Sequence, residues 1–197
     1  MEQAQRTNAS FFGWGSSKTS DLNYGKTTHI PCLFFQYQNG SSKCLIYFHG
    51  NAEDIGLSYE MLDHLRTSLK INILAMEYPT YGIYEDAGGC SHDKIISDAE
   101  DVFTFILKET KLKAKDIILF GRSLGSGPSS YLASKFHPGA LILMSGYTSI
   151  RSIVQSKVGS LLSYIVQERF DNINLMPKVF CPTFILHGQK DSLIPYS

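Results

Sequence analysis

From about residue 29 onward, the chain alternates between short apolar runs and segments with the periodicity of a helix. Each apolar run has the length of a buried strand and is bounded by Gly, Pro or polar turn residues. The runs cover residues 30–37, 44–48, 71–76, 117–120, 140–144 and 183–186. Buried strands that alternate with helices are typical of mainly parallel sheets covered on both faces. The sequence therefore predicts an α/β fold.

Three segments between these runs show the three- and four-residue apolar spacing of amphipathic helices. The first covers residues 55–69. The second begins after Ser91, whose hydroxyl suits an N-cap, and runs to residue 107. The third opens just after Ser123 and ends at the His-Pro-Gly sequence of residues 137–139. We expect their apolar stripes to pack on the sheet.

The balanced charge of the chain argues against a nucleic-acid partner. Lys and Arg number 18, Asp and Glu number 18, and no basic run occurs, so we expect no nucleic-acid partner. No apolar stretch approaches the roughly 20 residues that cross a bilayer, and the polar start does not have the pattern of a secretion signal. We expect a cytosolic protein without metal or cofactor. Membrane contact stays open, although no lipid anchor motif indicates it.

Residues 29–197 are expected to form one α/β domain, because composition marks no linker and no internal repeat occurs. Residues 1–28 are rich in Ser, Thr, Gly and Asn and predict an irregular or weakly paired N-terminal segment. The cysteines lie far apart and form no C-x-x-C pair, so we expect buried free thiols rather than disulfides. They are Cys32, Cys44, Cys90 and Cys181.

The pattern most specific for chemistry is G-x-S-x-G at residues 121–125, between an apolar run and a helical pattern. A strand that turns sharply into a helix holds its central residue in a strained conformation, and small residues on either side let the backbone pass. Gly121 and Gly125 supply them. Ser123 would then stand above the sheet as a nucleophile, with the N–H of Leu124 directed at an oxyanion. The alternative is an ordinary serine in a glycine-rich turn.

A second loop, with the sequence His-Gly-Asn-Ala-Glu-Asp, follows the apolar run at 44–48. Such a loop can offer another backbone N–H to an oxyanion, here from Asn51 or Ala52. A histidine before a glycine at a strand end more often hydrogen-bonds to loop backbone than takes a proton in catalysis. We therefore expect His49 to hold the loop rather than to act as a base.

A third pattern follows the run at 183–186, where a polar turn contains one acid, Asp191. Asp191 comes after Ser123 in the chain, which fits the order Ser, Asp, His of one class of catalytic triad. It is expected to orient an imidazole, and the alternative is a turn-forming aspartate. Asp171 and Asp86 are weaker candidates because neither follows a strand end in this order.

Five motifs in this order resemble the α/β-hydrolase superfamily. They are Tyr-Phe-His-Gly-Asn-Ala-Glu-Asp at 47–54, Glu-Tyr-Pro-Thr-Tyr-Gly at 77–82, Gly-Arg-Ser-Leu-Gly-Ser-Gly-Pro-Ser at 121–129, Ser-Gly-Tyr-Thr-Ser-Ile at 145–150 and Leu-His-Gly-Gln-Lys-Asp-Ser-Leu-Ile-Pro at 186–195. More narrowly, the chain resembles the alpha/beta hydrolase domain-containing proteins of the 17 and 13 groups, which are related to serine aminopeptidase-like hydrolases.

This resemblance implies a serine hydrolase that works through an acyl-enzyme. Ser123 would be the nucleophile and Asp191 the triad acid. The oxyanion donors would be the N–H groups of Asn51 or Ala52 and of Leu124. The 17 group removes palmitate from cysteines of membrane-associated proteins, which implies an S-acylated protein or an acylated small molecule as substrate. The cysteine-rich N-terminus of that group has no counterpart in this sequence.

The triad histidine also has no counterpart. The superfamily places it on a loop after the strand that follows the acid, whereas all six histidines of this sequence precede Asp191. Loss of one triad member costs several orders of magnitude in rate. We therefore expect a C-terminally truncated product that lacks the last strand and helices and is itself nearly inactive. The run at 183–186 would then be an exposed apolar edge.

Residues 148–170 hold an apolar segment where the superfamily places insertions that cover the substrate pocket. The segment is expected either to line an acyl-chain groove or simply to pack on the sheet. Two other functions stay open. One is a hydrolase-like protein that binds an acyl ligand or a partner without catalysis, and the other is a serine aminopeptidase-like peptidase.

Overall fold

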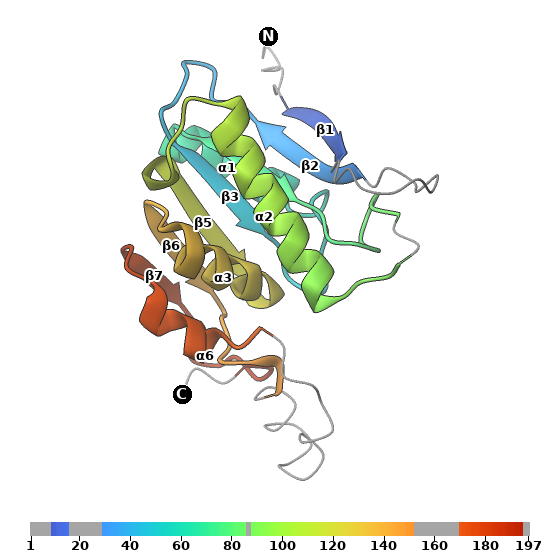
Figure 1. Cartoon of the computed structure of the whole chain (residues 1–197), viewed down its shortest axis with the longest axis vertical. Coiled ribbons are helices and arrows are strands. Elements are labelled where there is room, and N and C mark those ends of the chain that lie inside the picture. The colour runs from blue at the N-terminus through green and yellow to red at the C-terminus, as the bar shows by residue number, and fades with distance from the viewer. Residues whose placement is uncertain (1–8, 16–28, 86–87, 152–169, 195–197) are drawn as a thin grey trace, which may run out of the picture.

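The computed structural model describes residues 9–15, 29–85, 88–151 and 170–194. They form a seven-stranded sheet of order β1-β2-β4-β3-β5-β6-β7 (Figure 1). The strands are β1 (Ala9–Gly15), β2 (His29–Phe35), β3 (Cys44–Phe48), β4 (Asn72–Met76), β5 (Ile117–Arg122), β6 (Ala140–Met144) and β7 (Thr183–Leu186). β2 is antiparallel to β1 and β4, and all other neighbours are parallel. The predicted α/β fold with a mainly parallel sheet is confirmed.

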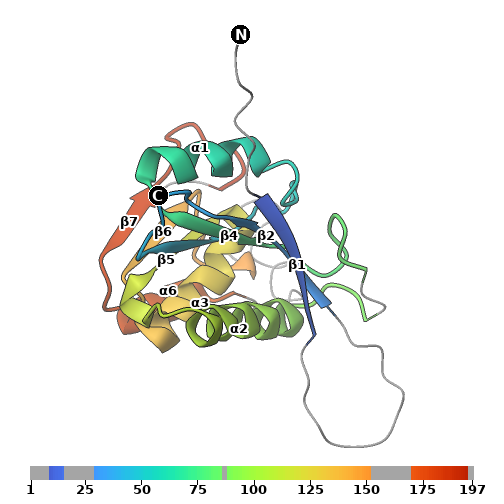
Figure 2. The same ribbon diagram turned by 90° about the horizontal axis from the view of Figure 1, so that it is seen from above.

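Helices cover both faces of the sheet, with α1 on one side and α2, α3 and α6 on the other (Figure 2). They are α1 (Tyr59–Leu69), α2 (His92–Glu109), α3 (Ser126–Phe136) and α6 (Asn172–Leu175), together with the 3₁₀ turns η1 (Ala114–Asp116), η2 (Ser123–Gly125) and η3 (Met176–Lys178). The Ser91 hydroxyl accepts the N–H of Lys94 at 3.2 Å, so the predicted N-cap of α2 is confirmed. The apolar stripe of this helix is buried against the sheet, also as predicted.

The first helix begins later than its apolar pattern predicts. Residues before Tyr59 form turns, and the carboxylate of Asp54 accepts the N–H of Leu57 at 2.8 Å. Aspartate competes with helix geometry by bonding nearby backbone N–H groups, and this bond holds the turn in place. Ile55, at the expected helix start, is buried in this turn.

Part of the N-terminal segment is a regular strand. Residues 9–15, expected to be irregular or weakly paired, form β1 and pair with the whole length of β2. Their sequence, Ala-Ser-Phe-Phe-Gly-Trp-Gly, shows no apolar alternation, and the strand forms through pairing rather than through local propensity. The rest of segment 1–28, and most of the apolar segment expected at 148–170, lie outside the described residues.

β3 anchors the centre of the sheet. All five of its residues are buried, with Ile46 and Phe48 in the core on one face and Leu45 and Tyr47 on the other. Phe48 lies in register with Gly121 of β5, so the carboxyl ends of these two strands meet at the same edge. Ligands of open α/β sheets bind at this edge, and the loops that leave it are the first place to seek a site.

β7 is an outer strand and is much less covered. Phe184 and Ile185 are each 60% exposed. Within the described residues, the run at 183–186 is thus an exposed apolar strand at the edge of the sheet.

The cysteines fall into two groups. Cys32 in β2 and Cys44 in β3 are buried, and burial raises the pKa of each thiol to about 12. Cys181 is half-buried and Cys90 is exposed, so the prediction of buried thiols is wrong for Cys90, which lies in the turn before α2. No helix in the described ranges is long and apolar enough to cross a bilayer.

Candidate active site

Ser123 lies at the sharp turn between β5 and α3, with a backbone φ of 49°. A positive φ is unusual for a residue with a side chain, and it persists only where the surrounding structure enforces it. A Cβ added to Gly121 would lie 2.3 Å from the carbonyl oxygen of Gly125, and one added to Gly125 would lie 2.0 Å from that of Phe48. The backbone can turn here because both flanking positions are glycine.

The loop after β3 lies against this turn. A Cβ added to Gly50 would stand 3.6 Å from the Cβ of Ser123 and 3.7 Å from the carbonyl oxygen of Arg122. The next two residues, Asn51 and Ala52, are exposed, and no partner of their N–H groups is recorded within the described part of the chain. The structure thus brings the two loops named as oxyanion donors beside the expected nucleophile.

His49 supports this loop from beneath. It is fully buried, and its Nδ1 lies 2.8 Å from the carbonyl oxygen of Gly50. Because a carbonyl can only accept, Nδ1 carries a proton and donates. The Gly50 carbonyl and the Asn51 N–H belong to one trans peptide and point in opposite directions, so the imidazole also fixes the direction of that N–H. The expectation that His49 binds loop backbone is confirmed.

Glu77, directly after β4, is the buried partner of His49. Its Oε1 lies 2.7 Å from Nε2 of His49, a contact at ion-pair distance rather than an aligned hydrogen bond. The carboxylate also accepts the N–H groups of Tyr78 at 3.2 Å and Ile55 at 3.3 Å. A Cβ on Gly82 would lie 2.4 Å from Oε2, so glycine at this position leaves room for the carboxylate.

Two tyrosines of the same segment complete the support. The Tyr78 hydroxyl donates to the carbonyl oxygen of His49 at 2.9 Å, and the Tyr81 hydroxyl donates to Oδ1 of Asn51 at 2.7 Å. Burial raises the pKa of Tyr81, so its hydroxyl stays protonated as a donor at neutral pH. The sequence marks residues 77–82 as a motif but gives them no role, because only the pairing of β3 with β4 brings them to the loop.

The other expected donor, Leu124, lies in η2. Its N–H is in the first turn of the helix and has no acceptor within it. The carbonyl oxygen of Leu124 accepts the hydroxyl of Tyr147 at 3.2 Å. Asn172 in turn donates to the carbonyl oxygen of Tyr147 at 2.9 Å and to the hydroxyl of Ser126 at 3.2 Å. The sequence marks Tyr147 only as a member of the motif at 145–150, without a role, and it gives no signal for Asn172.

Asp191 lies in the turn after β7, which local hydrogen bonds hold together. Its Oδ1 accepts the N–H groups of Leu193 and Ile194, both at 2.9 Å. Nε2 of His187 lies 2.7 Å from the carbonyl oxygen of Ile194 and 3.6 Å from Oδ2 of Asp191. The N–H of Ile194, then that of Leu193, holds the pKa of Asp191 below its ordinary value, so the carboxylate is charged at neutral pH.

The parallel register places Ser123 and Asp191 at one edge of the sheet. Arg122 at the end of β5 pairs with Met144 of β6, which pairs with Leu186 at the end of β7. The carboxyl ends of β5 and β7, which precede Ser123 and Asp191, therefore lie at the same height in the sheet, with β6 between them.

The remaining candidates lie elsewhere. The carboxylate of Asp171 accepts the amide of Asn174 at 2.6 Å beside α6, and Asp86 falls outside the described residues. Among the described residues, no contact between a histidine side chain and Ser123 is recorded. The described residues therefore bring the loop of Asn51 and Ala52 beside Ser123, and place the strand end before Asp191 at the same edge of the sheet.

Sequence comparison finds homologues. No protein-family model matches the chain. Alpha/beta hydrolase domain-containing protein 17B of Homo sapiens is 26% identical over 172 residues, 87% of this chain and 58% of that protein. Protein 17C of Xenopus laevis is 29% identical over 168 residues, 85% of this chain and 52% of that protein. The chain thus spans only a little over half the length of these curated relatives.

Comparison with solved structures supports the fold. The esterase Pf2001 of Pyrococcus furiosus superposes with a TM-score of 0.71 at 18% identity, over 96% of this chain and 74% of that one. The fluorophosphonate-binding serine hydrolase FphF of Staphylococcus aureus has a TM-score of 0.65 at 15% identity, over 95% and 81% of the two chains. The chain therefore has the α/β-hydrolase fold. Its homologues include the alpha/beta hydrolase domain-containing proteins 17B and 17C.

Proposed function

We propose that the protein is a serine hydrolase that cleaves an ester or thioester through an acyl-enzyme. The observation that carries this proposal is the φ of 49° at Ser123, enforced by glycines on both sides and set against the loop of Asn51 and Ala52. Backbone strain at a residue with a reactive side chain is characteristic of functional sites. The hydrolase homologues support the same conclusion.

In the proposed reaction, Oγ of Ser123 attacks the acyl carbonyl carbon and gives its proton to a general base. The carbonyl oxygen becomes an oxyanion and accepts the N–H of Leu124 and that of Asn51 or Ala52. The intermediate then expels the thiolate or alkoxide, which takes the proton from the base. Water, activated by the same base, attacks the acyl-serine and releases the acid.

Asp191 is proposed to orient the base through its carboxylate. A histidine is the usual base in such a triad, and its second ring nitrogen donates to the acid. No histidine of the described residues contacts Ser123, so we propose that the base comes from a part of the protein outside them.

The proposed substrate is an S-acylated protein or an acylated small molecule. This choice is supported by the sequence relationship to the 17 group of alpha/beta hydrolase domain-containing proteins. The proposal includes a cytosolic location, with contact to the membrane surface where S-acylated proteins lie.

A fluorophosphonate probe tests the nucleophile. The protein expressed from its complete gene should react with the probe, and Ser123→Ala should abolish labelling. Ser134→Ala, the same substitution near the other end of α3, is the matched control and should label like the parent. Labelling that survives in Ser123→Ala would reject Ser123 as nucleophile.

The substrate is tested by comparing hydrolysis of a palmitoylated cysteine peptide with that of the corresponding serine ester. We expect faster release from the thioester, and none in Ser123→Ala. A protein that binds the acyl peptide but turns over neither substrate would favour the non-catalytic acyl-binding function.

A further inference from the structure

One carboxylate joins the two donor loops. Oε1 of Glu53 accepts the N–H of Gly50 at 2.7 Å and the hydroxyl of Tyr47 at 3.3 Å. Its other oxygen, Oε2, accepts a hydrogen bond from Nη1 of Arg122 at 2.8 Å. Gly50 belongs to the loop after β3, and Arg122 directly precedes Ser123. The pair therefore fastens the loop of one strand to the turn that ends its neighbour.

This carboxylate lies close to the reacting serine. A Cβ added to Gly50 would be 3.0 Å from Oε1 of Glu53 and 3.6 Å from the Cβ of Ser123. The side chain of Glu53 is only 14% exposed, so water screens its charge incompletely. An oxyanion that forms beside Ser123 would be repelled by this negative charge unless a positive group balances it.

Arg122 is that positive group. A guanidinium is always charged in proteins, and here it contacts the oxygen of Glu53 that does not bind Gly50. The Gly50 N–H is occupied by Glu53, which leaves the next N–H groups along the loop, those of Asn51 and Ala52, to face an oxyanion.

We propose, on the basis of the function proposed above, that Glu53 and Arg122 are positioning residues of the oxyanion site. Glu53 holds the loop after β3 through the N–H of Gly50, and Arg122 neutralises the charge that this contact places beside the oxyanion. Neither residue contacts the acyl group. The two side chains therefore act on the transition state through geometry and charge rather than through bonding to substrate.

This assignment predicts an unusual result for a pair of substitutions. Arg122→Met should lower kcat about tenfold with little change in KM, because an unbalanced anion opposes only the charged transition state. Glu53→Gln keeps an oxygen acceptor for Gly50 and removes the charge, so it should change kcat less than threefold. The double variant should regain most of the activity that Arg122→Met loses. Glu53→Ala, which removes the acceptor as well, should be slower than Glu53→Gln.

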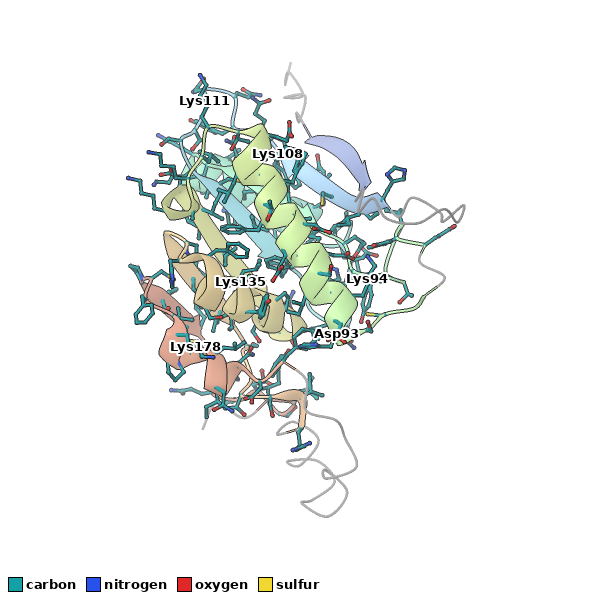
Figure 3. The ribbon with its side chains drawn as sticks, in the orientation of Figure 1. Asp93, Lys94, Lys108, Lys111, Lys135 and Lys178 are labelled. Carbon is teal, nitrogen blue, oxygen red and sulfur yellow. The ribbon has the colours of Figure 1, made fainter. Side chains whose placement is uncertain are left out.

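A matched control comes from the face of the sheet that α2, α3 and α6 cover. Lys135 on α3, labelled in Figure 3, pairs with Glu100 and its side chain is 46% exposed, the same as that of Arg122. Lys135→Met therefore removes a cation of equal exposure at the end of α3 opposite to Ser123, and it should leave kcat unchanged. Thermal unfolding of Lys135→Met should stay near that of the parent, because exposed ion pairs contribute little to stability.

The experiment uses the protein expressed from its complete gene, with p-nitrophenyl butyrate as substrate and Ser123→Ala as baseline. The kcat loss in Arg122→Met should shrink at high salt, since ions screen the unbalanced charge. A double variant no faster than Arg122→Met, or an Arg122→Met variant with parental kcat, overturns the inference. Hydrolysis that persists in Ser123→Ala would instead overturn the proposed function, so the two failures are distinguishable.

Discussion

The two halves of the proposed active site are held by different forces. Ser123 and the loop after β3 rest on central strands, and every residue of β3 is buried. Asp191 follows β7, where Phe184 and Ile185 are each 60% exposed. The turn that carries Asp191 depends instead on hydrogen bonds among its own residues, to the N–H groups of Leu193 and Ile194.

Packing therefore positions the proposed nucleophile, whereas local hydrogen bonds position the proposed acid. A close-packed interior tolerates neither a missing nor an added group. An exposed turn tolerates substitutions that preserve its few acceptors. Changes to the packed groups beneath Ser123 should therefore cost stability, whereas changes in the Asp191 turn should cost activity with little loss of stability.

The largest expected effect is on activity, in the half that carries Asp191. Asp191→Asn keeps an oxygen that can accept both N–H groups but loses the charge that would orient and stabilise an imidazolium. We expect kcat/KM for ester hydrolysis to fall about 10³- to 10⁴-fold with little change in the unfolding midpoint. Asp171→Asn is the control. Equal activity in the two variants would remove Asp191 from the site.

Truncation of an apolar side chain should destabilise the protein more at β3, beneath Ser123, than at β7, before Asp191. Phe48→Ala should lower the free energy of unfolding by about 3–5 kcal/mol, because this ring is fully buried. Phe184→Ala, on β7, should change it by less than about 0.5 kcal/mol. Urea denaturation measures both values, and similar losses would mean that β7 is as well packed as β3.

Addition of a methyl group tests the same contrast. Gly125→Ala would place a Cβ 2.0 Å from the carbonyl oxygen of Phe48, whereas Gly188→Ala, beyond β7, would meet nothing within 4 Å. We expect a loss of about 3 kcal/mol for the first and no loss for the second. A stable Gly125→Ala variant would show that the turn at Ser123 can relax.

The smallest effect concerns pH. Backbone N–H groups lower the pKa of Asp191 below the ordinary value of 3.8. A depressed pKa in the folded state stabilises the fold above the unfolded pKa, and this contribution is lost as pH falls through the folded value. A carbon-detected NMR titration of the Asp191 carboxyl should therefore give a midpoint below 3.8. A midpoint at or above that value would show that the backbone N–H groups of the turn do not stabilise the Asp191 carboxylate.

The sequence predicts the strands that consist mostly of apolar residues. Residues 44–48, 140–144 and 183–186 match β3, β6 and β7 at both ends. β1 is not predicted, because apolar and polar residues do not alternate in its sequence and the strand forms only by pairing with β2. In the same way, local signals identify the loop of His49 and the turn of Ser123.

The supporting residues of the site are not predictable in this way. Glu77 reaches His49, and Asn172 reaches Tyr147, only through strand pairing and helix packing between distant segments. Glu53 shows the limit most clearly. Its place before a helical pattern suggests a role at the helix dipole, whereas its carboxylate bonds Gly50 and Arg122.

The buried thiols of β2 and β3 can report how often the sheet opens. With a pKa near 12, the thiols of Cys32 and Cys44 remain protonated and shielded at neutral pH. An alkylating reagent should therefore modify Cys90 readily and reach Cys32 and Cys44 only when the sheet opens. The mass of alkylated protein after a timed pulse would then report how often the centre of the sheet unfolds, independently of any enzymatic assay.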